Sequence, residues 1–301
     1  MKVLIIRGGA LGDTLMLLPA LSVLSNRVEI SFVGREPGLG FVRHWVHSAK
    51  NLECGGWHRL FGADMDGHPL PVPRADRVIA FFADETGRLG QRFQAFLPHA
   101  SIYIFPSFPP GDRAIHVARY VAQCLRRADL GVDVDGAMEN SLRRPLIQNH
   151  QWVMRSNRVL FHPGSGDKKK NHPPGWWCRL MDAFQDRAGE TGFSRILLLG
   201  PAEGHLLPEF QTRLKTSGTA LVHCPSTEEL TVLLQESGLV IGHDSGICHL
   251  SAMLGTPTIA LFRKTDPVQW QPLGPQVQVI TRLSSDEQLV RNVRDAAFSL
   301  L

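Results

Sequence analysis

The sequence lacks the marks of secreted, metal-stabilised and membrane-spanning proteins. Its five cysteines are an odd number and form no CxxC pair, so they indicate neither a disulfide framework nor a zinc site. No window approaches the ~18 consecutive apolar residues of a membrane span. Arg7 interrupts the apolar run at the N-terminus and no small-residue cleavage site follows, so we expect no signal peptide. These absences predict a cytoplasmic protein and leave peripheral contact at the inner face of the cytoplasmic membrane open.

The chain also lacks a strong excess of either charge. Its formal net charge is +4, and the basic residues of the first half are scattered apart from Arg126-Arg127 and Arg143-Arg144. This pattern predicts no nucleic-acid partner, although a mildly basic surface suits an anionic glycolipid or membrane face. A length of 301 residues with 43% hydrophobic residues is typical of two globular domains with real cores.

Short apolar runs alternate with segments of helical period along the whole chain. The first half carries expected strands at residues 3–6, 28–33, 78–82 and 102–105, and expected helices at 14–24, 88–96 and 115–128. After Pro145 the pattern restarts, with strands at 159–161, 196–199, 220–222, 239–241 and 258–261 and helices at 176–187, 203–214, 227–236 and 247–254. This alternation predicts an α/β protein with two parallel, doubly wound sheets.

A polar stretch at residues 143–158 separates the two patterns. We therefore expect one domain at residues 1–150 and another at 151–301, with the last helix of the chain able to pack back on the first domain. Ligands bind such sheets where strands turn into helices, which directs attention to five loops.

The first loop carries a carboxylate among glycines. It reads Gly8-Gly9-Ala10-Leu11-Gly12-Asp13, which is G-G-x-x-G and not the G-x-G-x-x-G fingerprint of dinucleotide binding. Gly9 and Gly12 let the backbone turn and come close to a ligand. Asp13 has two interpretations: the N-cap of a helix that begins at Thr14, or a general base at a strand–turn–helix corner.

The second and third loops predict a donor site. Ser165, Gly166 and Lys170 lie in a Gly/Ser/Lys loop after a strand, where ammonium and backbone N–H groups suit a diphosphate. The alternative is a solvated basic loop. Glu203 follows the strand that ends at Gly200, where an acid could hold ribose hydroxyls or cap a helix.

The fourth loop has the most specific pattern. Asp244, Ser245 and Gly246 follow a strand and open a helix, whose N-terminal N–H groups can bind an anion. His249 lies four residues after Ser245 and can share that pocket. The fifth loop, residues 264–267, is expected to line the same face.

Taken together, these residues resemble glycosyltransferase family 9, the ADP-heptose:lipopolysaccharide heptosyltransferases, over nearly the whole chain and most strongly at residues 1–24 and 158–272. Asp13 matches the family's proposed catalytic aspartate, and Lys170 matches the lysine of its K-x-W-P segment, with His172 where tryptophan is usual. The D-[ST]-G-x-x-H segment is intact from Asp244 to His249. Members of the family carry an acidic residue just after the strand that here ends at Gly200. The matching position in this chain is Glu203 or, in another alignment, His205.

The resemblance implies the GT-B fold: two Rossmann-like domains facing a central cleft, with the acceptor in the first and the nucleotide sugar in the second. It implies an inverting displacement in which Asp13 takes the proton of the acceptor hydroxyl. The expected donor is ADP-heptose and the expected acceptor a lipopolysaccharide-type or other glycan. No cofactor or metal is expected, because the D-x-D pair Asp64 and Asp66 lies in a Gly/Pro-rich loop outside the matched regions.

Three other functions stay open at this point. The chain could be a non-catalytic homologue that binds a nucleotide sugar or glycolipid, a nucleotide-sugar epimerase of GT-B architecture, or a dinucleotide oxidoreductase. The joint presence of Asp13, Lys170 and the Asp244 segment favours transfer over binding alone.

Overall fold

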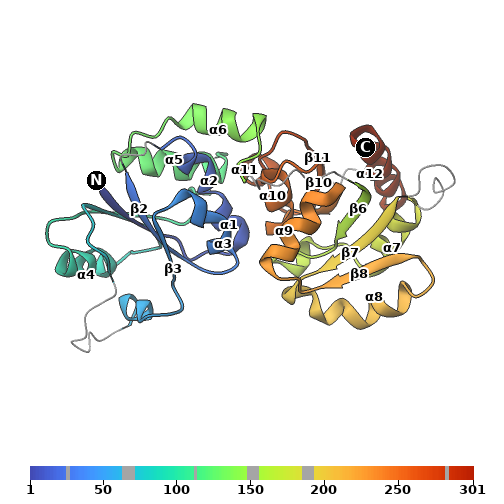
Figure 1. Cartoon of the computed structure of the whole chain (residues 1–301), viewed down its shortest axis with the longest axis horizontal. Helices are drawn as coiled ribbons and strands as arrows, with labels where there is room; N and C mark the ends of the chain where they lie inside the picture. The colour runs from blue at the N-terminus through green and yellow to red at the C-terminus, as the bar shows by residue number, and fades with distance from the viewer. Residues whose placement is uncertain (25–27, 63–71, 112–113, 148–155, 185–192, 282–284) are drawn as a thin grey trace. The chain divides into compact units, whose positions relative to one another are not determined.

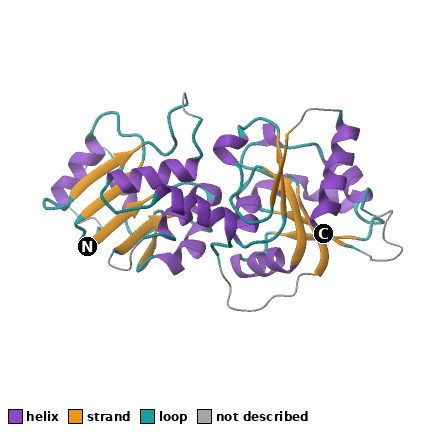
Figure 2. Cartoon of the chain, turned by 90° about the horizontal axis from the view of Figure 1, so that it is seen from above, coloured by secondary structure: helices purple, strands orange, loops and turns teal. Residues whose placement is uncertain are grey.

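The computed structural model describes residues 1–24, 28–62, 72–111, 114–147, 156–184, 193–281 and 285–301. They form two compact units, Met1–Asn140 and Ser141–Leu301. The domain boundary expected after residue 150 falls within 148–155, outside the described residues. Each unit contains a parallel β-sheet with helices on both faces (Figures 1 and 2).

The first unit holds a five-stranded sheet in the order β3-β2-β1-β4-β5. Its strands are β1 (Lys2–Ile6), β2 (Glu29–Gly34), β3 (Ser48–Asn51), β4 (Arg77–Phe81) and β5 (Ser101–Phe105). Its helical segments are α1 (Leu11–Leu15), α2 (Leu18–Leu21), α3 (Gly38–Val42), η1 (Arg43–Trp45), η2 (Trp57–Leu60), α4 (Arg88–Phe96) and α5 (Val117–Arg127), followed by α6 (Val134–Arg143), which runs into the second unit.

The second unit holds a six-stranded sheet in the order β11-β10-β9-β6-β7-β8. Its strands are β6 (Ser156–His162), β7 (Ser194–Leu199), β8 (Thr219–His223), β9 (Ser237–His243), β10 (Thr258–Phe262) and β11 (Val277–Thr281). Its helical segments are η3 (Lys168–Lys170), α7 (Pro174–Asp182), η4 (Pro201–Leu206), α8 (Leu207–Arg213), α9 (Thr227–Glu236), α10 (Gly246–Met253), α11 (Pro267–Trp270) and α12 (Asp286–Leu300). Both strand orders are those of Rossmann-like sheets, so the predicted α/β fold class is confirmed.

The central strands are apolar in unbroken runs because helices bury both of their faces. In β6, Val159 and Phe161 lie in a cluster with α7 and α12, while Leu160 between them is fully buried as well. The apolar side chains of α12, for which packing on the first domain was an alternative, lie in this second-unit core: Leu289, Val293 and Ala297.

Two expected helices differ from the structure for the same reason. The helix predicted at 14–24 is divided into α1 and α2, and the one predicted at 203–214 is η4 followed by α8. Pro19 and Pro208 lie in the first turns of α2 and α8. Proline has no N–H to donate to the residue four positions earlier, so each helix restarts there. The edge strands β3 and β11 were not predicted.

Candidate functional site

The predicted site residues follow the strands at which each sheet reverses its order. The order reverses between β1 and β4 in the first unit and between β6 and β9 in the second. Ligands bind open α/β sheets at the carboxyl ends of such strands. The loop of Asp13 follows β1, the loop of Lys170 follows β6, and Asp244 follows β9. Both switch points therefore carry predicted residues.

Asp13 occupies a different position in its helix from the one expected. Helix α1 begins at Leu11 with Ala10 as its N-cap, so Asp13 is the third helical residue and not the cap. Its Oδ2 accepts a hydrogen bond from the Ala10 N–H at 3.0 Å. A Cβ on Gly9 would lie 2.4 Å from Asp13 Cβ, so only glycine fits beneath this carboxylate. Gly12 lies in the same first turn, and no described residue hydrogen-bonds to Asp13 Oδ1.

A buried arginine supports this loop, and sequence reasoning gave it no role. Arg7 is 1% exposed and follows β1 directly. Its Nε donates to Asp13 O at 2.8 Å, its Nη1 donates to Ser107 O at 3.0 Å, and its guanidinium lies 5.0 Å from the Phe81 ring centre. Burial lowers the pKa of Arg7, while the Asp13 carboxylate opposes that shift. The sequence signal for such a role is a charged residue, Arg7, directly after a buried apolar strand.

In the second unit, Asp244 brings together side chains from three of the predicted loops, the second, the fourth and the fifth. Its Oδ2 accepts hydrogen bonds from Lys170 Nζ at 2.7 Å and from Thr265 Oγ1 at 2.6 Å, and its Oδ1 lies 3.7 Å from His249 Nε2. Burial acts to raise the pKa of Asp244, but the nearby His249 and the hydrogen bonds from Lys170 and Thr265 outweigh it and lower the pKa to about 2. The carboxylate is therefore ionised and holds Lys170 in place. The fifth loop lines the same face through Thr265, as expected.

The N-terminus of α10 lies next to this ion pair in the chain. Ser245 is its N-cap, with an extended backbone and no capping hydrogen bond from its side chain. The first turn begins at Gly246, and its backbone N–H groups have no acceptor one turn earlier within the helix. These groups can receive an anion beside Lys170.

Ser165 and Gly166 have different surroundings within the Lys170 loop. Ser165 Oγ hydrogen-bonds to Asn171 Oδ1 at 2.6 Å and to Asp167 O at 2.8 Å, so this hydroxyl links the two ends of the loop. Gly166 is exposed, and a Cβ placed there would meet no atom within 4 Å. Gly166 thus faces open space, whereas Ser165 lies inside the loop.

Glu203 packs against Gly164 in the loop that leads to Lys170, and it acts as a capping residue of η4. Its Oε2 accepts a hydrogen bond from the Gly200 N–H at 2.9 Å, and it is 4% exposed. A Cβ on Gly164 would lie 2.1 Å from its carboxyl group. His205 is more exposed, with Nδ1 3.2 Å from Ala202 O. The capping role weighed for Glu203 is present, and its contact with a ribose stays a prediction.

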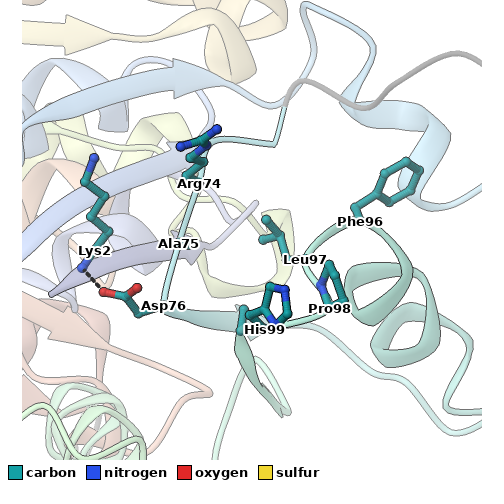
Figure 3. A pocket seen from close by; sticks show the side chains of 9 residues that line it. Lys2, Arg74, Ala75, Asp76, Phe96, Leu97, Pro98 and His99 are labelled. Carbon is teal, nitrogen blue, oxygen red and sulfur yellow. Dashed lines mark hydrogen bonds between the residues drawn. The ribbon is translucent and has the colours of Figure 1, made fainter.

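A pocket of about 570 Å³ lies at the amino ends of strands in the first sheet, away from the carboxyl ends that carry the Asp13 loop (Figure 3). Lys2 begins β1 there, and its N–H donates to Asp76 Oδ2 at 2.7 Å just ahead of β4. Apolar side chains of the α4–β5 turn complete the wall. The pocket lies at the amino ends of the strands and contains no predicted site residue, so it is not the candidate site.

The residues that the structure describes contain neither a metal-binding cluster nor a membrane-spanning helix. No three His, Cys, Asp or Glu side chains come together in a group that could hold a metal ion. No helix in the described segments has the length and apolarity to cross a bilayer. Asp64 and Asp66 lie outside the described residues.

Comparison with known proteins decides the family. The profile of glycosyltransferase family 9 (heptosyltransferase) matches residues 79–295, most of the chain. The chain belongs to glycosyltransferase family 9. It is 34% identical over 130 residues to lipopolysaccharide heptosyltransferase 3 of Escherichia coli K12, a stretch that covers 42% of this chain. The match spans only about a third of that relative, 34% of its length.

Solved structures of this family share the fold. A glycosyltransferase family 9 structure from Veillonella parvula superposes with a TM-score of 0.71 at 17% identity, covering 99% of this chain and 97% of the other. The E. coli heptosyltransferase WaaC, solved with ADP, gives 0.68 at 15% identity and covers 98% and 100%. The predicted GT-B class, with two Rossmann-like units, is therefore confirmed.

Proposed function

We propose that this chain is an inverting, metal-independent glycosyltransferase that moves a sugar from a nucleoside diphosphate to an acceptor hydroxyl. The proposed donor is ADP-heptose, and the proposed acceptor is a lipopolysaccharide-type glycolipid or another glycan. The first domain binds the acceptor and the second binds the donor. A cytoplasmic location, with peripheral contact at the inner membrane face, belongs to the same proposal. The E. coli structure with bound ADP supports an adenine nucleotide.

The observation that carries the proposal is the ion pair at the second switch point. Lys170 Nζ is held 2.7 Å from Asp244 Oδ2, and the N-terminus of α10 follows Asp244 in the chain. A departing nucleoside diphosphate gains negative charge as its bond to the sugar breaks. A cation and helix N–H groups fixed in advance stabilise that charge without reorganising during the reaction.

The proposed reaction is one displacement. An Asp13 carboxylate oxygen takes the proton of the acceptor hydroxyl. At the same time the acceptor's hydroxyl oxygen forms a bond to the anomeric carbon of the donor sugar. The bond from this carbon to the diphosphate breaks, and its electron pair leaves with the nucleotide. Attack opposite the leaving group inverts the anomeric configuration. Gly9 and Gly12 are proposed for the acceptor side, and these residues for the donor: Ser165, Gly166, Lys170, Glu203, Asp244, Ser245, Gly246 and His249.

A thermal-shift screen tests the donor class. ADP and ADP-heptose should raise the melting temperature more than UDP, GDP, TDP and their sugars, with NAD(P) as the oxidoreductase control. A ligand at a hundred times its Kd adds about 2.7 kcal/mol to the stability of the folded state, enough to measure. A response to UDP or TDP sugars alone would reassign the donor. A response to NAD(P) alone, or to no nucleotide, would contradict the proposal.

Sugar transfer should continue in excess EDTA. The physical reason is that Lys170 and the α10 N-terminus already supply positive charge to the leaving group, the role that Mg²⁺ or Mn²⁺ plays in metal-dependent transferases. The measurement is the initial rate of transfer with and without chelator. Loss of activity that Mg²⁺ or Mn²⁺ restores would contradict metal independence and direct attention to Asp64 and Asp66.

A further inference from the structure

One peptide group next to Lys170 is held from two strands at once. The carbonyl oxygen of Asn171 accepts a hydrogen bond from Arg263 Nη1, and the N–H of His172 donates to His243 Nε2 at 2.9 Å. His243 ends β9, and Arg263 follows β10 directly. Both polar groups of the Asn171–His172 peptide are thus bound by side chains far along the chain.

The rest of the loop leaves this peptide little freedom. The His172 ring stacks on Trp176 with ring centres 4.1 Å apart and on His243 at 5.1 Å. Trp177 lies edge-on to His243 at 5.2 Å. On the other side, Asn171 Oδ1 hydrogen-bonds to the Ser165 hydroxyl. The segment after Lys170 is therefore fixed by stacking as well as by hydrogen bonds.

The bond to His243 requires a deprotonated Nε2, because only the neutral ring can accept a hydrogen bond there. Burial holds the pKa of His243 well below its ordinary value, and neighbouring His172, His162 and Arg263 lower it further. The ring therefore remains an acceptor at neutral pH.

We propose that Arg263 and His243 are positioning residues of the donor site, which hold the Asn171–His172 peptide and thereby keep Lys170 beside Asp244 for the diphosphate. The two residues act through Lys170 and need not touch the nucleotide. This role rests on the proposed function, because that function assigns the diphosphate to Lys170.

Amide hydrogen exchange tests the clamp without any ligand. In Arg263→Met and in His243→Phe, which keeps a stacking ring but loses the acceptor, the peptide covering residues 163–172 should exchange at least about tenfold faster than in the parent. Lys215→Met removes an exposed cation elsewhere in the unit and should leave that peptide unchanged. Arg263→Lys keeps the charge and should restore part of the protection. Unchanged exchange in both clamp variants would overturn the proposal.

A double-mutant cycle on ADP affinity tests whether the two residues act through Lys170. Arg263→Met and His243→Phe should each weaken ADP binding by up to about tenfold in the parent and by less than about twofold in the Lys170→Ala background. If the fold losses of ADP affinity multiply in the double variants, the two residues contact the nucleotide directly, and the positioning role is overturned. So would unchanged ADP affinity in both single variants.

The two proposals fail in different ways. A parent chain that does not bind ADP overturns the proposed donor and, with it, the positioning role for Lys170. A parent that binds ADP, with additive variants or unaltered exchange, overturns the positioning role alone. Melting temperatures of all variants identify any loss of affinity that comes from unfolding.

Discussion

Asp13→Asn is expected to fold and bind ADP like the parent while transferring sugar about 10²–10⁴ times more slowly. Asn has nearly the shape of Asp, and its carbonyl oxygen can accept the Ala10 N–H that Asp13 Oδ2 accepts at 3.0 Å. It also fits above Gly9, where space is tight. The amide cannot take a proton from the acceptor hydroxyl, so the chemical step alone should suffer.

The matched variant for this test is Asp13→Ala. It loses the bond to Ala10 as well as the carboxylate, and the loss of such a capping contact costs about 0.5–2 kcal/mol of stability. Melting temperature, ADP affinity and single-turnover transfer should be measured for both variants. An Asn variant that transfers at nearly the parental rate would leave Asp13 with a capping role only.

Lys170→Ala is expected to weaken ADP binding by about tenfold or more. The variant removes a charge-assisted contact of roughly 1.5–3 kcal/mol. It also leaves the Asp244 carboxylate facing the diphosphate without the Lys170 ammonium group that it pairs with in the parent. Repulsion from Asp244 adds to the lost attraction. Titration calorimetry with ADP measures both effects together.

Two further variants separate the lost attraction of Lys170 from the repulsion by Asp244. Asp244→Asn in the Lys170→Ala background should recover part of the affinity, because the repulsive charge is gone. Lys168→Ala removes an exposed lysine from the same loop and should have the smaller effect. If Lys168→Ala loses ADP binding while Lys170→Ala keeps it, the diphosphate is bound by the other lysine.

The repeating pattern of strands and helices was predictable because each signal is local. Unbroken apolar runs mark strands that are buried on both faces, and a loop must follow each one. The loops of Asp13, Lys170 and Asp244 could therefore be located from neighbouring residues alone. The edge strands β3 and β11 escaped prediction because they are only partly buried and lack a fully apolar run.

The contacts that support the site could not be read in the same way. Arg263 bonds to a residue 92 positions away, and His172 to one 71 positions away. Such pairs exist because β9 lies between β6 and β10, and strand order is a property of the whole sheet. Arg7 is similar, since its partner Ser107 lies two strands along. Local sequence patterns therefore predict where the site residues lie, whereas the order of the strands in the sheet determines which distant residues support them.

The most direct test of the account is a transfer assay on the parent chain with ADP-heptose and a lipopolysaccharide-type acceptor. Mass spectrometry of the acceptor and a count of released ADP should show one sugar gained for each ADP formed, with the new bond of inverted anomeric configuration. Three results would contradict the central claim: ADP released while the sugar passes to water, a donor that isomerises with the acceptor unchanged, or ADP-heptose that binds without turning over.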